Sequence, residues 1–130
     1  MHKSFLITAA IFGGLAVALG AFGAHGLEKL TADTKTLHGF RTGVEYQMYH
    51  TLTLIAVAIL FEKFPGRWLK WAGNFFIAGV ILFSGSLYLL TIFKVQDSSA
   101  VKFIGPVTPV GGLFFIAGWL FFLLAVVKKK

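Results

Sequence analysis

Four long apolar runs occupy most of this 130-residue sequence, and they constrain its fold more than any other feature. The runs extend over about residues 5–22, 44–61, 71–92 and 107–127. Each is close to the roughly 20 residues that an α-helix needs to cross the hydrocarbon core of a bilayer. Because backbone polar groups in lipid must be satisfied within the chain, we expect each run to be a transmembrane helix. The sequence therefore predicts an all-α, polytopic membrane protein with a single domain over residues 1–130, folded as a compact four-helix transmembrane bundle with short loops.

The composition favours lipid over water as the solvent around these runs. Hydrophobic residues make up 57% of the chain and charged residues 13%, about half the usual share for a soluble domain. The net charge is +7, but the lysines and arginines lie between and after the apolar runs instead of forming one patch. Flanking cations of this kind anchor helices to lipid headgroups, so we expect the lipid bilayer and not nucleic acid as the partner. The absence of cysteine excludes disulfides, thiolate catalysis and cysteine-bound metals.

The distribution of cations also predicts the orientation of the chain. Four crossings place both termini on one side of the membrane, and the positive-inside rule assigns the more basic side to the cytoplasm. The side with the termini carries Lys3, Lys63, Arg67, Lys70, Lys128, Lys129 and Lys130, and the other side carries Lys29, Lys35, Arg41, Lys94 and Lys102. We therefore predict a multi-pass protein of the cytoplasmic cell membrane with both termini in the cytoplasm.

Two connections between the runs carry recognisable signals. Thr108 and Pro109 are expected to cap and begin the fourth helix, because a missing N–H group is tolerated at the first helical position. Residues 31–41 are expected to extend the helix of the second run along the membrane interface.

Small residues recur at helical spacing in three of the runs. Close contact between backbones supplies much of the packing energy in lipid, where burying leucine gives no net gain. Spacings of seven, or of four and three, keep one face of a helix against a neighbour. The residues expected to form such packing faces are Gly13, Ala16, Gly79, Gly111 and Gly118.

The second run carries the only concentrated polarity. Its polar residues fall within one stripe of an ideal helix, formed by His38, Thr42, Glu45, Tyr46, Tyr49, His50 and Thr53. One interpretation is a proton relay or small polar pathway, since ionisable groups at membrane depth usually face a bundle interior or a wet cavity. The other is that His50 and the tyrosines hydrogen-bond neighbouring helices, which is the commoner role of a single histidine with hydroxyl neighbours. Arg41 is expected to pair with Glu45 one turn away.

Other constellations give weaker signals. A metal or haem site from His25 and His50 is disfavoured because the two histidines differ in depth, and we expect no cofactor and no metal. Ser84 and Ser86 lack the histidine and aspartate that would activate a nucleophile, and we expect them to hydrogen-bond to their own helix. The sequence thus predicts no catalytic residue and no enzymatic activity.

Four stretches resemble one family of small membrane proteins along the whole chain. They are Gly-Ala-Phe-Gly-Ala-His-Gly-Leu at 20–27, Tyr-Gln-Met-Tyr-His-Thr-Leu at 46–52, Phe-Ser-Gly-Ser-Leu-Tyr-Leu at 83–89, and Gly-Pro-Val-Thr-Pro-Val-Gly-Gly at 105–112, which continues to Trp119. The family is domain of unknown function 423, which includes vertebrate transmembrane protein 256. The resemblance implies a four-span membrane protein without an established reaction, so no catalytic residue is inherited. The matching motifs contain His25, His50, Ser84, Ser86, Tyr88 and Thr108, which are the positions to test.

The leading functional hypothesis is a structural or accessory subunit docked on a larger membrane complex. It rests on the short loops and on the lack of a recognisable cofactor site. The alternative is a proton or small-solute pathway through the polar face of the second run. The residues proposed for such a pathway, or for an interhelical hydrogen-bond cluster, are His25, Glu45, Tyr46, Tyr49, His50, Ser84, Ser86, Tyr88 and Thr108.

Overall fold

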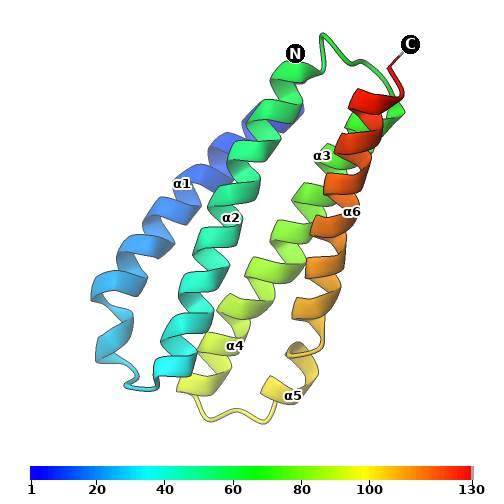
Figure 1. Ribbon diagram of the computed structural model, residues 1–130. Helices are drawn as coiled ribbons and strands as arrows, with labels where there is room; N and C mark the ends of the chain where they lie inside the picture. Colours follow the sequence, from blue (N-terminus) through cyan, green and yellow to red (C-terminus); the bar gives the residue numbers. More distant parts are fainter. Residues whose placement is uncertain (130) are drawn as a thin grey trace.

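The computed structural model describes residues 1–129, and these residues form helices without a strand (Figure 1). The α-helices are α1 (Lys3–His25), α2 (Thr34–Leu60), α3 (Arg67–Gly79), α4 (Gly85–Val95), α5 (Val101–Ile104) and α6 (Val107–Val127). A short 3₁₀ helix, η1 (Leu27–Lys29), follows α1, and a π-helical segment, η2 (Val80–Ser84), joins α3 to α4 in one continuous rod. The predicted all-α class is confirmed.

The long helical rods of residues 1–129 are α1, α2, α3–η2–α4 and α6. They stand side by side and alternate in direction (Figure 1). Helix α1 packs along α2, α2 packs on the α3–η2–α4 rod, and α6 packs on α3 and η2. The central pair is therefore α2 and the α3–η2–α4 rod, with α1 on one side and α6 on the other. Both chain ends lie at the same end of the molecule (Figure 1), although Lys130, one of the basic residues expected there, lies outside the described residues.

Among residues 1–129, three helical segments are long and apolar enough to cross a membrane: Lys3–Lys29, Arg67–Val95 and Val101–Val127. They contain the first, third and fourth runs predicted from the sequence. The second run lies in α2, a 27-residue helix that also includes most of the expected extension at residues 31–41. Polar residues in the N-terminal half of α2 lower its hydropathy below that of the other rods.

Local sequence explains the start of α2, but the predicted start of the last helix needs a correction. Asp33 caps α2, because its side chain accepts a hydrogen bond from the Lys35 N–H group. A hydrogen bond from the Thr36 hydroxyl and, to a smaller extent, the one from Lys35 lower the pKa of the Asp33 carboxyl. The prediction that Thr108 caps the last helix is wrong. Helix α6 begins at Val107, with Pro106 as its N-cap residue and without a side-chain cap, so Thr108 lies inside the first turn and its hydroxyl pairs with Ser86 of α4.

The predicted small residues differ in how closely the helices approach them. A methyl group on Gly118 would lie 2.7 Å from the Phe76 ring, and one on Gly79 would overlap the Phe115 ring. A methyl group on Gly111 would overlap the backbone of Phe83, so α6 touches η2 directly there. On α1, by contrast, Ala16 is buried, but Gly13 leaves room for a methyl group at 3.5 Å from Thr51.

Candidate functional site

Helix α2 carries polar side chains on two different sides, and the structure separates them. The inner polar network comprises the residues that hydrogen-bond between helices inside the molecule: Gln47, His50, Ser84, Ser86, Tyr88, Thr108 and Trp119. The outer polar face comprises exposed residues of α2: His38, Arg41, Glu45 and Tyr49. The sequence stripe placed His50 together with Glu45 and Tyr49, but the structure assigns them to different regions.

Gln47 is at the centre of the inner polar network and is almost fully buried. Its Nε2 donates to the carbonyl oxygen of Phe12 on α1 at 2.8 Å. Its Oε1 accepts a hydrogen bond of 2.6 Å from the hydroxyl of Tyr88 on α4. One amide group therefore joins three helices, and its position fixes their relative height.

Two serines near η2 make further links between helices. Ser84 donates to the carbonyl oxygen of Gly43 on α2 at 2.6 Å, so the prediction that it bonds to its own helix is wrong. Ser86 donates to Phe83 O in its own helix, as expected, and its Oγ also lies 2.5 Å from the Thr108 hydroxyl on α6. Because the Ser86 proton is used for Phe83, Thr108 is the donor in that pair.

The π-helical segment explains why these serines reach both neighbours. A π-helical turn adds one residue to the helical repeat and rotates the side chains that follow it. Ser84 ends this segment and points to α2, whereas Ser86, two residues later, points to α6. A regular α-helix through residues 80–84 would give these serines a different register.

His50 is held by hydrogen bonds at both ring nitrogens. The indole N–H of Trp119 on α6 donates to Nε2 at 3.2 Å, and Nδ1 lies 2.8 Å from the carbonyl oxygen of Tyr46. An indole nitrogen can only donate, so Nε2 is the acceptor and Nδ1 carries the proton. His50 is therefore a neutral imidazole that links α2 to α6.

Aromatic rings surround this histidine. The Phe115 ring stacks on the imidazole at 3.7 Å between centroids, with an angle of 8° between the planes. The ring centroids of Phe76, Trp119 and Tyr46 lie 5.6, 6.0 and 6.1 Å from that of His50, which also lines an open groove between α2 and α6. His25, at the exposed end of α1, is not part of this cluster. Within residues 1–129, no three side chains of the metal-binding types come together.

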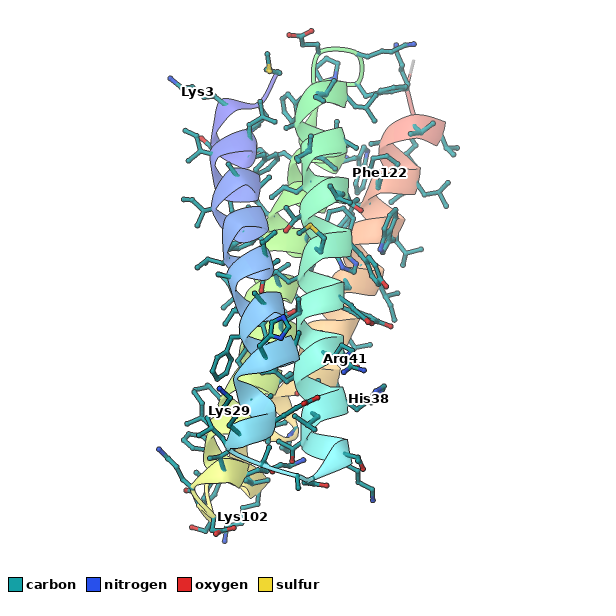
Figure 2. All side chains as sticks on the ribbon, turned by 90° about the vertical axis from the view of Figure 1, so that its left-hand side faces the viewer. Lys3, Lys29, His38, Arg41, Lys102 and Phe122 are labelled. Carbon is teal, nitrogen blue, oxygen red and sulfur yellow. The ribbon has the colours of Figure 1, made fainter. Side chains whose placement is uncertain are left out.

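The outer polar face points away from the rest of the molecule. Figure 2 shows His38 and Arg41 projecting outward from α2. Glu45 is exposed, and the Tyr49 side chain is 54% exposed one turn further along the helix. The predicted Arg41–Glu45 ion pair is not formed. The only ion pair within residues 1–129 joins the N-terminal amine to Glu62 at 2.7 Å, and this hydrogen bond lowers the pKa of the Glu62 carboxyl.

Contacts with neighbouring helices give the depth of Glu45. The residue before it, Val44, lies against Gly20 of α1. Two residues before it, Gly43 accepts the hydrogen bond from Ser84. Both contacts are inside the apolar parts of α1 and of the α3–η2–α4 rod. Glu45 is thus level with apolar stretches of its neighbours and not with their charged ends.

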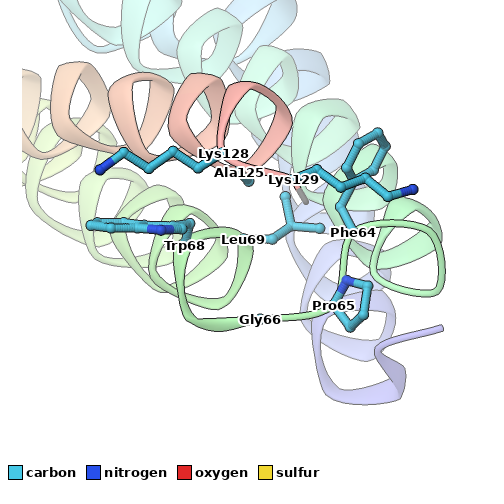
Figure 3. Close-up of a pocket in the computed structure, with 8 residues that line it drawn as sticks. All are labelled: Phe64, Pro65, Gly66, Trp68, Leu69, Ala125, Lys128 and Lys129. Carbon is cyan, nitrogen blue, oxygen red and sulfur yellow. The ribbon is translucent and has the colours of Figure 1, made fainter.

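A hollow at the end with the termini is another candidate for a ligand site (Figure 3). Lys128 and Lys129 lie on its rim, with their Nζ atoms 5.1 Å from the ring centroid of Trp68 and 4.7 Å from that of Phe64. The two amines point in opposite directions, away from the centre of the hollow (Figure 3). The hollow therefore offers no convergent set of polar groups.

Sequence reasoning missed three residues of the site: Gln47, Gly43 and Trp119. Gln47 lies on the side of α2 opposite the sequence stripe, so a search for clustered polarity passed over it. Gly43 contributes only its carbonyl group. The position of Trp119 in the middle of an apolar run was a usable signal, since an indole N–H at that depth requires an acceptor.

Comparisons with known proteins agree with this architecture. The family model described as "Protein of unknown function (DUF423)" matches residues 19–112. The UPF0382 membrane protein YwdK of Bacillus subtilis is 46% identical over 97% of this chain and 98% of its own length. The UPF0382 inner membrane protein YgdD of Escherichia coli K12 is 42% identical over 98% of this chain and 92% of its own length. No solved structure matches the chain. With a family match over most of its length and relatives named as membrane proteins, the chain belongs to the DUF423 family and is a membrane protein.

Proposed function

We propose that this chain is a four-span protein of the bacterial cytoplasmic membrane and acts as a non-enzymatic assembly subunit, a structural or accessory component of a larger membrane complex. One observation carries the proposal: an ionisable residue, Glu45, faces outward from the molecule at a depth where its neighbouring helices are apolar.

In this proposal α2 is the fourth span. Helix α2 packs along the length of α1 and against the α3–η2–α4 rod, two segments that can cross a membrane. A helix that is level with such neighbours crosses the same hydrocarbon layer. Its inner polar groups are compatible with that position, because Gln47 and His50 are paired with groups on other helices.

The outer polar face is then the unsatisfied part of the molecule. A charged side chain costs about 2.5–3.5 kcal/mol at the centre of a membrane helix on insertion scales and less toward its ends, and polar residues within the hydrocarbon layer usually face protein or water. Within residues 1–129, the side chains of Glu45 and Tyr49 are exposed and form no hydrogen bond or ion pair. A further membrane helix packed over this face would supply the missing partners, which is the role expected of a subunit in an assembly.

A proton or solute pathway within a single chain has less support. The interior polar groups are occupied by hydrogen bonds between helices, and both ring nitrogens of His50 are engaged. The other ionisable residues of the stripe, which include His38, Glu45 and Tyr49, are exposed. A pathway along them would itself require a second subunit to exclude lipid.

The test uses the absence of cysteine in the chain. We would introduce Tyr49→Cys on the outer polar face and, as a control, Leu15→Cys on the exposed apolar surface of α1, and attach a photoactivated cross-linker to each in native membranes. We expect a protein adduct from position 49 and only lipid adducts from position 15. Absence of any protein adduct from Tyr49→Cys and from Leu52→Cys would contradict the proposal.

A further inference from the structure

We propose that the subunit covering the outer polar face is a second copy of this chain, with the α2 helices of the two copies packed in parallel about a two-fold axis normal to the membrane. This inference rests on the proposed function, because it names the partner that the outer polar face requires.

The exposed side of α2 has the spacing of a helix-pairing surface. From Glu45 it continues through Tyr49, Leu52, Ala56 and Ile59, at intervals of four, three, four and three residues. Tyr49, Leu52 and Ile59 are each more than half exposed. A repeat of this kind keeps one face of a helix against a parallel neighbour over several turns. The C-terminal half of α2 therefore has an exposed surface on which a second helix can pack.

The charges on this surface are complementary to themselves. Arg41 and Glu45 are exposed, lie one turn apart, and form no ion pair within residues 1–129. In a parallel pair each residue lies at the same depth as its counterpart. Arg41 of one copy is then displaced by about 6 Å along the axis from Glu45 of the other, which an arginine side chain can span. The symmetry forms this contact twice and neutralises both acidic groups.

The other outward surfaces suit lipid. The exposed large residues of α1 include Ile7, Ile11 and Leu15, and those of α6 include Leu120 and Leu123. With the predicted orientation, in which both termini are cytoplasmic, all copies insert into the membrane in the same direction, so a parallel arrangement is available to them. One self-complementary face on each copy gives a closed pair and not a chain of subunits.

The first test exchanges the charges. We would express Arg41→Glu and Glu45→Arg with different affinity tags and measure co-purification from membranes in mild detergent. Each variant alone is expected to lose self-association at least about tenfold, because like charges then face each other. Co-expression of the two variants should restore association, since one face is then acidic and the other basic. The double variant Arg41→Glu/Glu45→Arg should associate with itself.

The pattern of rescue separates pairing from folding. A variant that merely misfolds would not be rescued by the oppositely charged variant, and its thermal unfolding in detergent would fall below that of the unaltered chain. Self-association that is unchanged in both single variants would overturn the inference, as would loss without rescue in variants that unfold normally.

The second test identifies the neighbour directly. Oxidation of Tyr49→Cys in membranes should give a disulfide-linked dimer of twice the chain mass, and Leu15→Cys should stay monomeric. If Tyr49→Cys gives no dimer while its photo-cross-linked form captures a different protein, the inference of a second copy fails and the proposed function stands. If it captures no protein at all, both fail.

Discussion

Gln47 shows at the scale of a single residue how a polar side chain is kept in the interior of this molecule. A buried amide without hydrogen bonds is costly, and in lipid no water is present to satisfy it. Both polar atoms of Gln47 are engaged, one by Phe12 O and one by the Tyr88 hydroxyl. Within residues 1–129, no buried polar side-chain atom lacks a partner. The inner polar network is therefore a structural device that fixes the height of the helices.

A double-mutant cycle on Gln47 and Tyr88 tests this role. Gln47→Leu leaves the Tyr88 hydroxyl without its acceptor, and we expect it to lower the free energy of unfolding by about 1–2 kcal/mol. Tyr88→Phe should cost less, and the double variant should cost less than the sum of the two. The free energy of unfolding of the unaltered chain, the two single variants and the double variant is compared by thermal unfolding in mild detergent. Strictly additive losses would show that the two side chains do not act together.

The sequence predicts these residues unevenly. The interhelical role of His50 and Tyr88 could be anticipated, because a polar group in an apolar run needs a partner in another helix. Ser86 was expected to bond to its own helix, and its further link to Thr108 of α6 was not. Gln47 could not be singled out, because it faces away from the polar stripe and its partner in α1 is a backbone carbonyl, which every residue has. The contact between Ser84 and Gly43 depends on the rotation introduced by η2, which has no clear sequence signal.

At the scale of the elements, the contact between α6 and η2 is the closest approach of two backbones through a glycine. Gly111 lies against the backbone of Phe83. Because the contact is with backbone atoms, it cannot be relieved by moving a side chain. The neighbouring Gly112 faces only the edge of the Phe83 ring, at 3.9 Å from its added methyl group. Two adjacent glycines in one helix thus meet different environments.

This difference gives a matched pair of variants. Gly111→Ala forces α6 away from η2, and we expect a loss of about 1–3 kcal/mol in the free energy of unfolding, as for other overpacked sites. Gly112→Ala should be neutral or slightly stabilising, because alanine favours the helix by roughly 0.8–1.0 kcal/mol over glycine. Melting temperatures in the same detergent compare them. Equal effects of the two substitutions would argue against the direct backbone contact.

The elements were more predictable than their ends. Hydropathy located three rods and the C-terminal half of α2, because length and apolar composition are sufficient for a helix in lipid. It did not give the start of α6, where a residue expected to cap its own helix bonds to Ser86 of α4 instead. Tertiary hydrogen bonds of this kind cannot be read from local sequence.

At the scale of the whole molecule, the even number of rods brings the two termini together at one end (Figure 1). Lys3 lies at that end, and Lys29 and Lys102 lie at the opposite end (Figure 2). The charges at the two ends are nearly balanced, so orientation depends on a small difference. The more basic end is the one with the termini, and we predict that it is cytoplasmic.

Reporter fusions test this orientation. A fluorescent protein that folds only in the cytoplasm should fluoresce when fused to either terminus. Alkaline phosphatase, which is active only after export, should be inactive at both termini and active when inserted between Ser98 and Ser99, in the connection between α4 and α5. Phosphatase activity at a terminus would reverse the predicted orientation.

The shared position of the termini has a consequence for protein engineering. If the end of one copy is joined to the start of another by a flexible linker, both halves enter the membrane in the same direction, since the linker need not cross it. A single polypeptide can thus hold two parallel copies at a fixed ratio, and each half can be altered separately. The arrangement also makes gene duplication a simple evolutionary route to a fused form with unlike halves.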